Sequence, residues 1–235
     1  MHPYQITEYN LAAPTTLRLA VVADLHNQCG DAAAAAVVST SPDAVLIVGD
    51  LFETPPRRKY FAYEEAVKFL EGIKGIPMFY ASGNHDTQMP EEMKQAMEAC
   101  GVTCLLDAYT SFGGIWLGGV TSGQFVGKTP NLAFLKEFSQ LEGYKLLLCH
   151  HPEYFRHISP LPIHLTLAGH AHGGQWRFFG RGIYSPEQGI FPKYTAGLYE
   201  ENRLLVSRGM KVHNRPVPRL FNPPELLLLS LSQNV

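Results

Sequence analysis

Five short apolar runs in this chain each end in a cluster of glycine, acidic, amide or imidazole residues. The clusters are Asp24-Leu25-His26, Gly49-Asp50, Gly83-Asn84-His85-Asp86, His150-His151 and Gly169-His170-Ala171-His172. In open α/β sheets, the carboxyl ends of the strands form the edge at which ligands bind. If the five runs are strands of such sheets, the five clusters meet at one edge. That requirement constrains the fold more than any other feature of the sequence.

The first half of the chain alternates strand and helix patterns. The predicted strands are 17–23, 44–48 and 76–81, and the predicted helices are 31–39, 60–73 and 90–99. Apolar residues recur at helical spacing through 60–73, and the last helix begins with Pro90 and two glutamates. Both features are typical of helices.

The second half is richer in strand patterns. We expect a hairpin around Gly113-Gly114 and a helix over 131–141, followed by strands over 145–149, 165–168, 197–200, 204–207 and 225–231. Strand–helix alternation followed by strands predicts α/β layers with two sheets. The stretch 176–194 is rich in glycine and aromatic residues without periodicity, which predicts a long ordered loop.

The spacing within the clusters indicates which side chains share a site. Residues two apart in an extended chain point the same way. Asp24 and His26 can therefore face one site, and so can His170 and His172. The same rule predicts that the neighbours at positions 150 and 151 point apart, so that only one of them faces inward.

A buried set of Asp, Asn and His side chains is costly unless something compensates it. A divalent metal ion does so, because imidazole and carboxylate groups suit zinc, iron, manganese and nickel. Seven or eight candidate ligands exceed what one ion usually takes. The sequence therefore predicts two divalent metal ions, and it does not distinguish among Mn, Fe, Zn and Ni.

Composition narrows the class of protein. With 235 residues, of which 46% are hydrophobic, the chain can fill one substantial core, and we expect 1–235 to form a single domain. The net charge of −2 argues against nucleic acid as a partner. No transmembrane segment or signal peptide is visible, which predicts a cytoplasmic protein. The four scattered cysteines are expected to be reduced, and nothing indicates an oligomeric state.

Taken in order, the five clusters resemble the motifs of the calcineurin-like metallophosphoesterase superfamily, over roughly residues 17–175. The tail is similar to a bacterial subgroup with some members near UDP-2,3-diacylglucosamine pyrophosphatases. The resemblance implies the metallophosphoesterase fold, a four-layer α/β/β/α sandwich with two mixed β-sheets. The metal ions would then lie at the sheet edge.

The resemblance also implies roles for the residues of the clusters. The metal ligands would be Asp24, His26 and His172 for the first ion, Asn84, His150 and His170 for the second, and Asp50 between the two. His85 would face the substrate and act as general acid. Asp86 would either orient His85 or cap a turn or helix. His151 departs from the family pattern, which has Asn or a similar amide there, and either lies near the substrate or packs.

The implied activity is hydrolysis of a phosphodiester, phosphomonoester or pyrophosphate bond in a small substrate, through in-line attack of a metal-bridging hydroxide. A nuclease on the same scaffold is an alternative, although it would need a basic track beside the site. A non-catalytic metal-binding interaction scaffold is another, although such proteins have usually lost the ligands. A second phosphate could meet one of several cations that could equally be surface charge: Arg57, Arg58, Lys59, Arg177, Arg181, Lys193 and Arg208.

Overall fold

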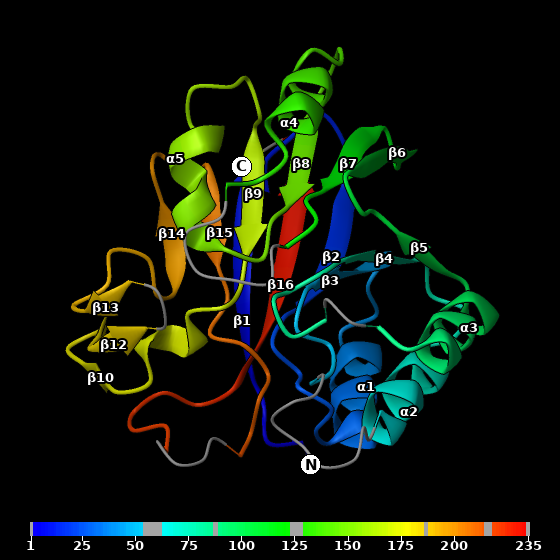
Figure 1. Cartoon of the computed structure of the whole chain (residues 1–235), viewed down its shortest axis with the longest axis vertical. Helices are drawn as coiled ribbons and strands as arrows, with labels where there is room; N and C mark the ends of the chain where they lie inside the picture. The colour runs from blue at the N-terminus through cyan, green and yellow to red at the C-terminus, as the bar shows by residue number, and fades with distance from the viewer. Residues whose placement is uncertain are drawn as a thin grey trace.

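Two six-stranded sheets pack against each other in the computed structural model (Figure 1). The structure describes residues 2–53, 63–86, 89–122, 129–185, 188–213 and 218–233. In spatial order, the first sheet contains β1 (Gln5–Ala12), β16 (Glu225–Ser232), β2 (Leu17–Val22), β3 (Ala44–Val48), β4 (Met78–Ala81) and β5 (Val102–Cys104). The second contains β14 (Gly197–Tyr199), β15 (Leu204–Val206), β9 (Leu165–Ala168), β8 (Lys145–Leu148), β7 (Ile115–Gly119) and β6 (Ala108–Phe112).

Both sheets are mixed, and each has a parallel centre. Strands β2 to β5 run parallel, whereas β16 is antiparallel to β2 and parallel to β1. In the second sheet, β7, β8, β9 and β15 run parallel, with β6 and β14 antiparallel at the two edges. The first and last strands therefore lie side by side in the first sheet, with β16 between β1 and β2 (Figure 1).

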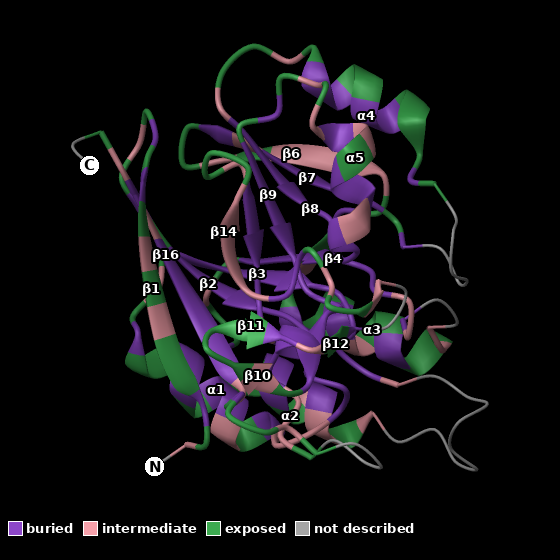
Figure 2. Ribbon diagram, turned by 90° about the vertical axis from the view of Figure 1, so that its left-hand side faces the viewer, coloured by how far each residue is buried: buried purple, intermediate pink, exposed green. Residues whose placement is uncertain are grey.

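Helices cover the outer face of each sheet. The first sheet carries α1 (Gly30–Ser39), α2 (Glu64–Gly72) and α3 (Glu91–Cys100), and the second carries α4 (Leu132–Ser139) and α5 (Phe155–Ile158). Figure 2 shows the central strands of both sheets buried along most of their length and helices exposed on one side. The order of layers is thus helix, sheet, sheet, helix, and the predicted α/β/β/α sandwich is confirmed.

Side-chain alternation along the central strands separates the cores. On β2, Ala20 and Val22 pack with residues of α1, α2 and α3, whereas Leu19 and Val21 pack between the sheets. Successive side chains of a strand point to opposite faces, so a strand buried on both faces reads as a continuous apolar run. On β8, Leu147 packs instead with the apolar faces of α4 and α5.

Most predicted elements occur, with ends displaced by a few residues. The helix predicted over 60–73 is α2, and residues 60–62 of that range lie outside the described residues. Strands β1 and β5 were not predicted, and most of β1 is exposed or half-buried. The loop predicted over 176–194 contains two short antiparallel ladders, β10 (Arg177–Phe178) with β11 (Arg181–Gly182) and β12 (Tyr184–Ser185) with β13 (Gly189–Ile190). No described helix has the length and hydropathy to cross a membrane.

Candidate metal centre

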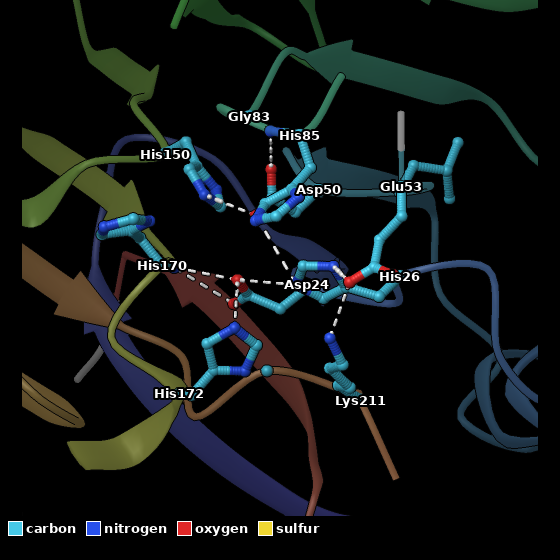
Figure 3. A network of polar contacts seen from close by, with 12 residues as sticks. Asp24, His26, Asp50, Glu53, Gly83, His85, His150, His170, His172 and Lys211 are labelled. Atoms are coloured by element: carbon cyan, nitrogen blue, oxygen red, sulfur yellow. Dashed lines mark hydrogen bonds and ion pairs between the residues drawn. The ribbon is translucent and has the colours of Figure 1, made fainter. Parts of the chain in front are cut away.

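The five polar clusters meet where β2, β3, β4, β8 and β9 end, as Figure 3 shows for most of their side chains. Backbone hydrogen bonds join the loops in pairs. The Asp24 amide donates to the Gly49 carbonyl at 3.1 Å, and the Gly169 amide donates to the His150 carbonyl at 3.0 Å. The His170 amide donates to both Asp24 carboxylate oxygens at 3.1 Å, which links the two sheets. The convergence predicted from the sequence is therefore observed.

Backbone conformation at the site differs from the extended form that we expected. Asp24, His26 and Asp50 have φ values of 52°, 51° and 52°, and His170 and His172 have values of 65° and 44°. These values are left-handed, a region that Asn, Asp and His enter more readily than other non-glycine residues. The pairs two apart do share a site, but the chain turns sharply at them instead of continuing as a strand. Such backbone strain is concentrated at functional sites in proteins.

Two glycines allow the loops to approach this closely. Gly49 has a φ of 79°, and a Cβ there would lie 2.6 Å from the Gly83 nitrogen and from His150 Nδ1. A Cβ on Gly83 would lie 2.1 Å from Asp50 Oδ1. Any larger residue at either position would push the Gly-Asp loop away from its neighbours.

The first candidate ligand group is Asp24, His26 and His172, whose ligand atoms all lie within 4.8 Å of one another. Asp24 Oδ1 is 3.6 Å from His172 Nε2 and 3.9 Å from His26 Nε2. The two imidazole rings stack with centroids 5.1 Å apart. All three side chains are buried.

The second candidate group is Asp50, His150 and His170, within the same 4.8 Å limit. His150 Nε2 lies 3.3 Å from Asp50 Oδ2, and the His150 and His170 rings have centroids 5.2 Å apart. Asn84 follows β4 beside His85, and its side-chain oxygen is buried.

Asp50 contacts both groups. Its Oδ2 is 3.5 Å from His26 Nε2 of the first group and 3.3 Å from His150 Nε2 of the second. The same oxygen is 4.0 Å from His85 Nε2, and Oδ1 accepts a hydrogen bond from the His85 amide at 2.8 Å. Asp50 therefore lies between the two groups, as the resemblance implies.

Hydrogen bonds at the far ring nitrogens orient two of the imidazoles. His150 Nδ1 lies 2.8 Å from the Val48 carbonyl, which can only accept, so Nδ1 carries a proton. His26 Nδ1 lies 3.2 Å from a Glu53 carboxylate oxygen, which the Lys211 ammonium also contacts at 2.8 Å. Each arrangement leaves Nε2 facing Asp50. Among the described residues, neither Nε2 has a hydrogen-bond partner.

Burial shapes the proton affinities of these groups. Burial raises the pKa of Asp24 to about 6 and lowers the pKa of His26 to about 4. It also holds the pKa of His172 well below its ordinary value. Burial alone would raise the pKa of Asp50, but the facing His150, His26 and His85 hold it well below its usual range.

This donor set suits divalent metal ions. Neutral imidazoles and ionised carboxylates are the forms that bind them. Both groups bring imidazole and carboxylate side chains together in a buried space, and a hydrogen bond to the second ring nitrogen is typical of metal-binding histidines. The residues present therefore fit divalent metal ions.

Sequence reasoning missed Glu53 and Lys211. Both are mostly buried, and their side chains are joined across 158 positions of the chain. Glu53 carries a weak signal, because it follows Asp50 by three residues in the Gly-Asp loop. Nothing in the sequence marks Lys211.

His151 is buried beside the second group. Its Nδ1 is 3.0 Å from a Glu153 oxygen, and its ring centroid lies 4.4 Å from that of His170 and 4.8 Å from that of Tyr154. The expectation that only one of the two neighbours at 150 and 151 faces inward is therefore wrong. Left-handed turns of the His170 loop bring its ring against both of them.

Asp86 joins two of the loops. Its carboxylate accepts hydrogen bonds from the backbone amides of Gly83 at 2.9 Å, Phe52 at 3.3 Å and Leu51 at 3.4 Å. These contacts favour the turn-capping role over the orienting role, and a part in catalysis stays a prediction.

Replacing Asp86 with alanine should destabilise the fold markedly. Three backbone amides would lose their acceptor inside the protein, and leaving one buried group unsatisfied costs about 1–3 kcal/mol. We expect Asp86→Ala to lower the free energy of unfolding by about 3 kcal/mol, and Asp86→Asn to lower it less because an acceptor oxygen remains. Denaturant titration of both variants measures this. Equal stability of the alanine variant and the wild type would contradict the capping role.

Three of the four described cations that were proposed for a second phosphate have protein partners. Arg177 donates to the Gly173 carbonyl and to Thr195, Lys193 pairs with Glu200, and Arg208 pairs with Glu225. Arg181 is exposed. Arg57, Arg58 and Lys59 lie outside the described residues.

Several known proteins are similar in sequence to this chain. The sequence model of the family described as calcineurin-like phosphoesterase matches residues 17–177. An uncharacterized metallophosphoesterase of Campylobacter jejuni is 29% identical over 220 residues, which cover 88% of this chain and 55% of that protein. Phosphodiesterase YaeI of Escherichia coli is 27% identical over 242 residues, which cover 94% and 83% respectively. YkuE of Bacillus subtilis, an uncharacterized metallophosphoesterase, is 24% identical over 82% of this chain and 68% of its own length.

Among solved structures, TT1561 of Thermus thermophilus superimposes with a TM-score of 0.51 at 15% identity, over 66% of this chain and 82% of that one. This likeness concerns the fold alone. The chain spans about half the length of the Campylobacter relative. The closer resemblance to UDP-2,3-diacylglucosamine pyrophosphatases stays a prediction.

Proposed function

The chain belongs to the calcineurin-like phosphoesterase family, and from this membership and the geometry of the site we propose that it hydrolyses a phosphate ester bond in a small substrate with the help of two divalent metal ions. The observation that carries the proposal is the position of Asp50 within 3.5 Å of an imidazole of each ligand group. We treat residues 1–235 as one catalytic domain, since β1 and β16 pair in the same sheet.

Asp24, His26 and His172 would hold one ion, Asn84, His150 and His170 the other, and Asp50 both. Ions bound there lower the pKa of a bound water and neutralise charge on phosphoryl oxygens. The chain's own groups prepare the site for this. Glu53 and the Val48 carbonyl keep the proton on Nδ1 of His26 and of His150, so that both Nε2 atoms are available as ligands.

His85 is suited to handle the proton of the leaving group. Its side chain is 17% exposed, whereas His26, Asp50 and His150 are almost completely buried, so it lies where a substrate can reach it. Its amide is tied to Asp50 Oδ1, and its ring packs edge-to-face on His26 with centroids 4.9 Å apart. These contacts hold the ring beside the ligand groups. We infer that it donates a proton to the oxygen that leaves phosphorus.

The direct test is a screen with bis(p-nitrophenyl) phosphate, p-nitrophenyl phosphate, cyclic nucleotides, nucleotide sugars and single-stranded DNA, each with Mn, Fe, Zn or Ni. We expect hydrolysis of small esters, with two bound ions per chain by metal analysis. Cleavage of DNA in preference to small esters would favour the nuclease alternative. Bound metal with no hydrolysis under any condition would favour the interaction scaffold.

Replacing His85 with alanine should separate metal binding from turnover. Because His85 is not a proposed ligand, we expect His85→Ala to keep the metal content of the wild type. Turnover should fall by about 10²–10⁴-fold, the usual contribution of proton transfer. The loss should be smallest for good leaving groups such as p-nitrophenolate, which need no proton. A variant that loses both metals would show that the role of His85 is wrongly assigned.

A further inference from the structure

Arg219 is a half-buried cation that forms no contact ion pair with an acidic side chain among the described residues. It lies in the segment before β16. Its Nη2 donates a hydrogen bond to the Gly209 carbonyl at 3.3 Å and lies 3.4 Å from His172 Nδ1. Its Nε and Nη1 are buried and have no hydrogen-bond partner among the described residues. None of the ion pairs among the described residues includes Arg219. A guanidinium keeps its positive charge in proteins.

Two other cations in the described part of the same segment are neutralised. Arg208 pairs with Glu225 at 2.6 Å, and Lys211 pairs with Glu53 at 2.8 Å. The contact of Arg219 with His172 cannot replace such a pair, because a guanidinium only donates and imidazole offers a neutral acceptor at best. A buried charge without a counter-charge reduces stability. Arg219 therefore forms no contact ion pair among the described residues, and the Asp24 carboxylate acts on it only across the His172 ring.

Arg219 also lines a hollow of about 540 Å³. Asn222 also lines the hollow, and its Nδ2 donates a hydrogen bond to the His172 carbonyl at 2.7 Å. The hollow therefore adjoins the candidate metal centre. Pro218, Pro224 and the 78% exposed Phe221 supply apolar walls. The hollow therefore places the Arg219 guanidinium, whose Nε and Nη1 have no protein partner among the described residues, next to apolar surface close to His172.

We propose that Arg219 binds a second oxyanion of the substrate, a phosphate or carboxylate group separate from the phosphoryl group that reacts. Guanidinium groups suit both oxyanions because their N–H donors form paired, charge-assisted hydrogen bonds. The inference rests on the proposed function, which places the reacting phosphoryl group beside His172. It makes Arg219 a specificity-determining residue that favours esters with a further negative charge over those without one.

The test compares three ligands that differ in the second anion. UDP-glucose carries a second phosphate, glycerophosphoserine carries a carboxylate, and glycerophosphoethanolamine carries neither. Dissociation constants are measured by calorimetry on chelator-treated protein, and inhibition constants are measured on metal-loaded protein hydrolysing bis(p-nitrophenyl) phosphate. The variants are Arg219→Gln, Arg219→Lys and, as matched control, Arg18→Gln, which changes an exposed arginine at the opposite end of β2 from Asp24.

We expect Arg219→Gln to weaken binding of at least one doubly anionic ligand about tenfold, the size of a lost charge-assisted hydrogen bond. Binding of glycerophosphoethanolamine should change less than twofold. Arg219→Lys should retain part of the affinity, and Arg18→Gln should match the wild type. Loss confined to UDP-glucose identifies phosphate as the anion, and loss confined to glycerophosphoserine identifies carboxylate.

Equal losses for all three ligands, or no loss for either doubly anionic ligand, would overturn the inference. Folding is checked by thermal melting, and we expect Arg219→Gln to melt no lower than the wild type because it removes an unpaired buried charge. Failure of the inference is distinct from failure of the proposed function. If only the inference fails, the wild type still hydrolyses esters. If only the proposed function fails, binding that depends on Arg219 remains, but no ester is hydrolysed.

Discussion

Replacing Asp50 with asparagine should abolish metal-dependent hydrolysis of bis(p-nitrophenyl) phosphate. The substitution keeps the shape of the side chain, and one oxygen can still accept the His85 amide. It removes the negative charge that lies between His26 and His150 and can place N–H donors against their ring nitrogens. Metal ions contribute several kcal/mol to phosphoryl transfer. A fall of about 10³-fold or more in kcat/KM is therefore expected.

The matched control for this variant is Asp31→Asn. Asp31 has the same side chain, but it is exposed in the first turn of α1 and belongs to none of the five polar clusters. The activity and metal content of Asp31→Asn should equal those of the wild type. Metal analysis of Asp50→Asn should show loss of at least one ion. Full activity of Asp50→Asn would exclude a site built around this carboxylate.

Removing metal should lower the thermal stability of the protein. Asp24, Asp50 and Asp86 are buried in one cluster, and bound cations would offset their mutual repulsion. A ligand present at 100 times its dissociation constant stabilises the native state by about 2.7 kcal/mol. In a chain of this size, each kcal/mol corresponds to about 2–4 °C in the melting temperature.

Treatment with a chelator should therefore lower the melting temperature by about 5–10 °C, and adding Mn²⁺ back should restore it. Asp50→Asn should show a smaller shift, and Asp31→Asn the full one. A melting temperature that responds to neither chelator nor added metal would mean that the cluster binds no ion tightly.

The meeting of the five clusters could be predicted because it depends on two local signals. Each apolar run ends in residues that are rarely buried together, and parallel strands present their carboxyl ends at a common edge. Those signals lie within a few residues of one another along the chain. The side chains around Asp24 and Asp50 accordingly gather in the structure, and their roles as metal ligands stay a prediction.

The local conformation of the site could not be predicted in the same way. The left-handed φ values at Asp24 and His170 accompany hydrogen bonds to loops far away in the chain, such as the bond from the His170 amide to Asp24 across 146 positions. The alternation rule for strands correctly predicted which side chains share the site, but it assumed an extended backbone that these residues do not have. A short-range rule cannot anticipate a turn that is held by a distant partner.

The residues that support the site were also beyond prediction from the sequence. Lys211 reaches Glu53, and Arg219 reaches His172, only because the segment before β16 passes beside the metal centre. An isolated lysine or arginine in a sequence usually indicates a solvated surface. Their partners become visible once the order of strands in the first sheet is known.

The central position of β16 bears on how the chain is made. A ribosome releases residues in order, and β1 pairs only with β16 among the described strands, so β1 has no neighbour until residues 225–232 emerge. The same late residues close the gap beside β2, whose end carries Asp24. Nascent chains that stop short of Glu225 should therefore expose the flank of β2 and be recognised by chaperones or proteases before a functional site can form.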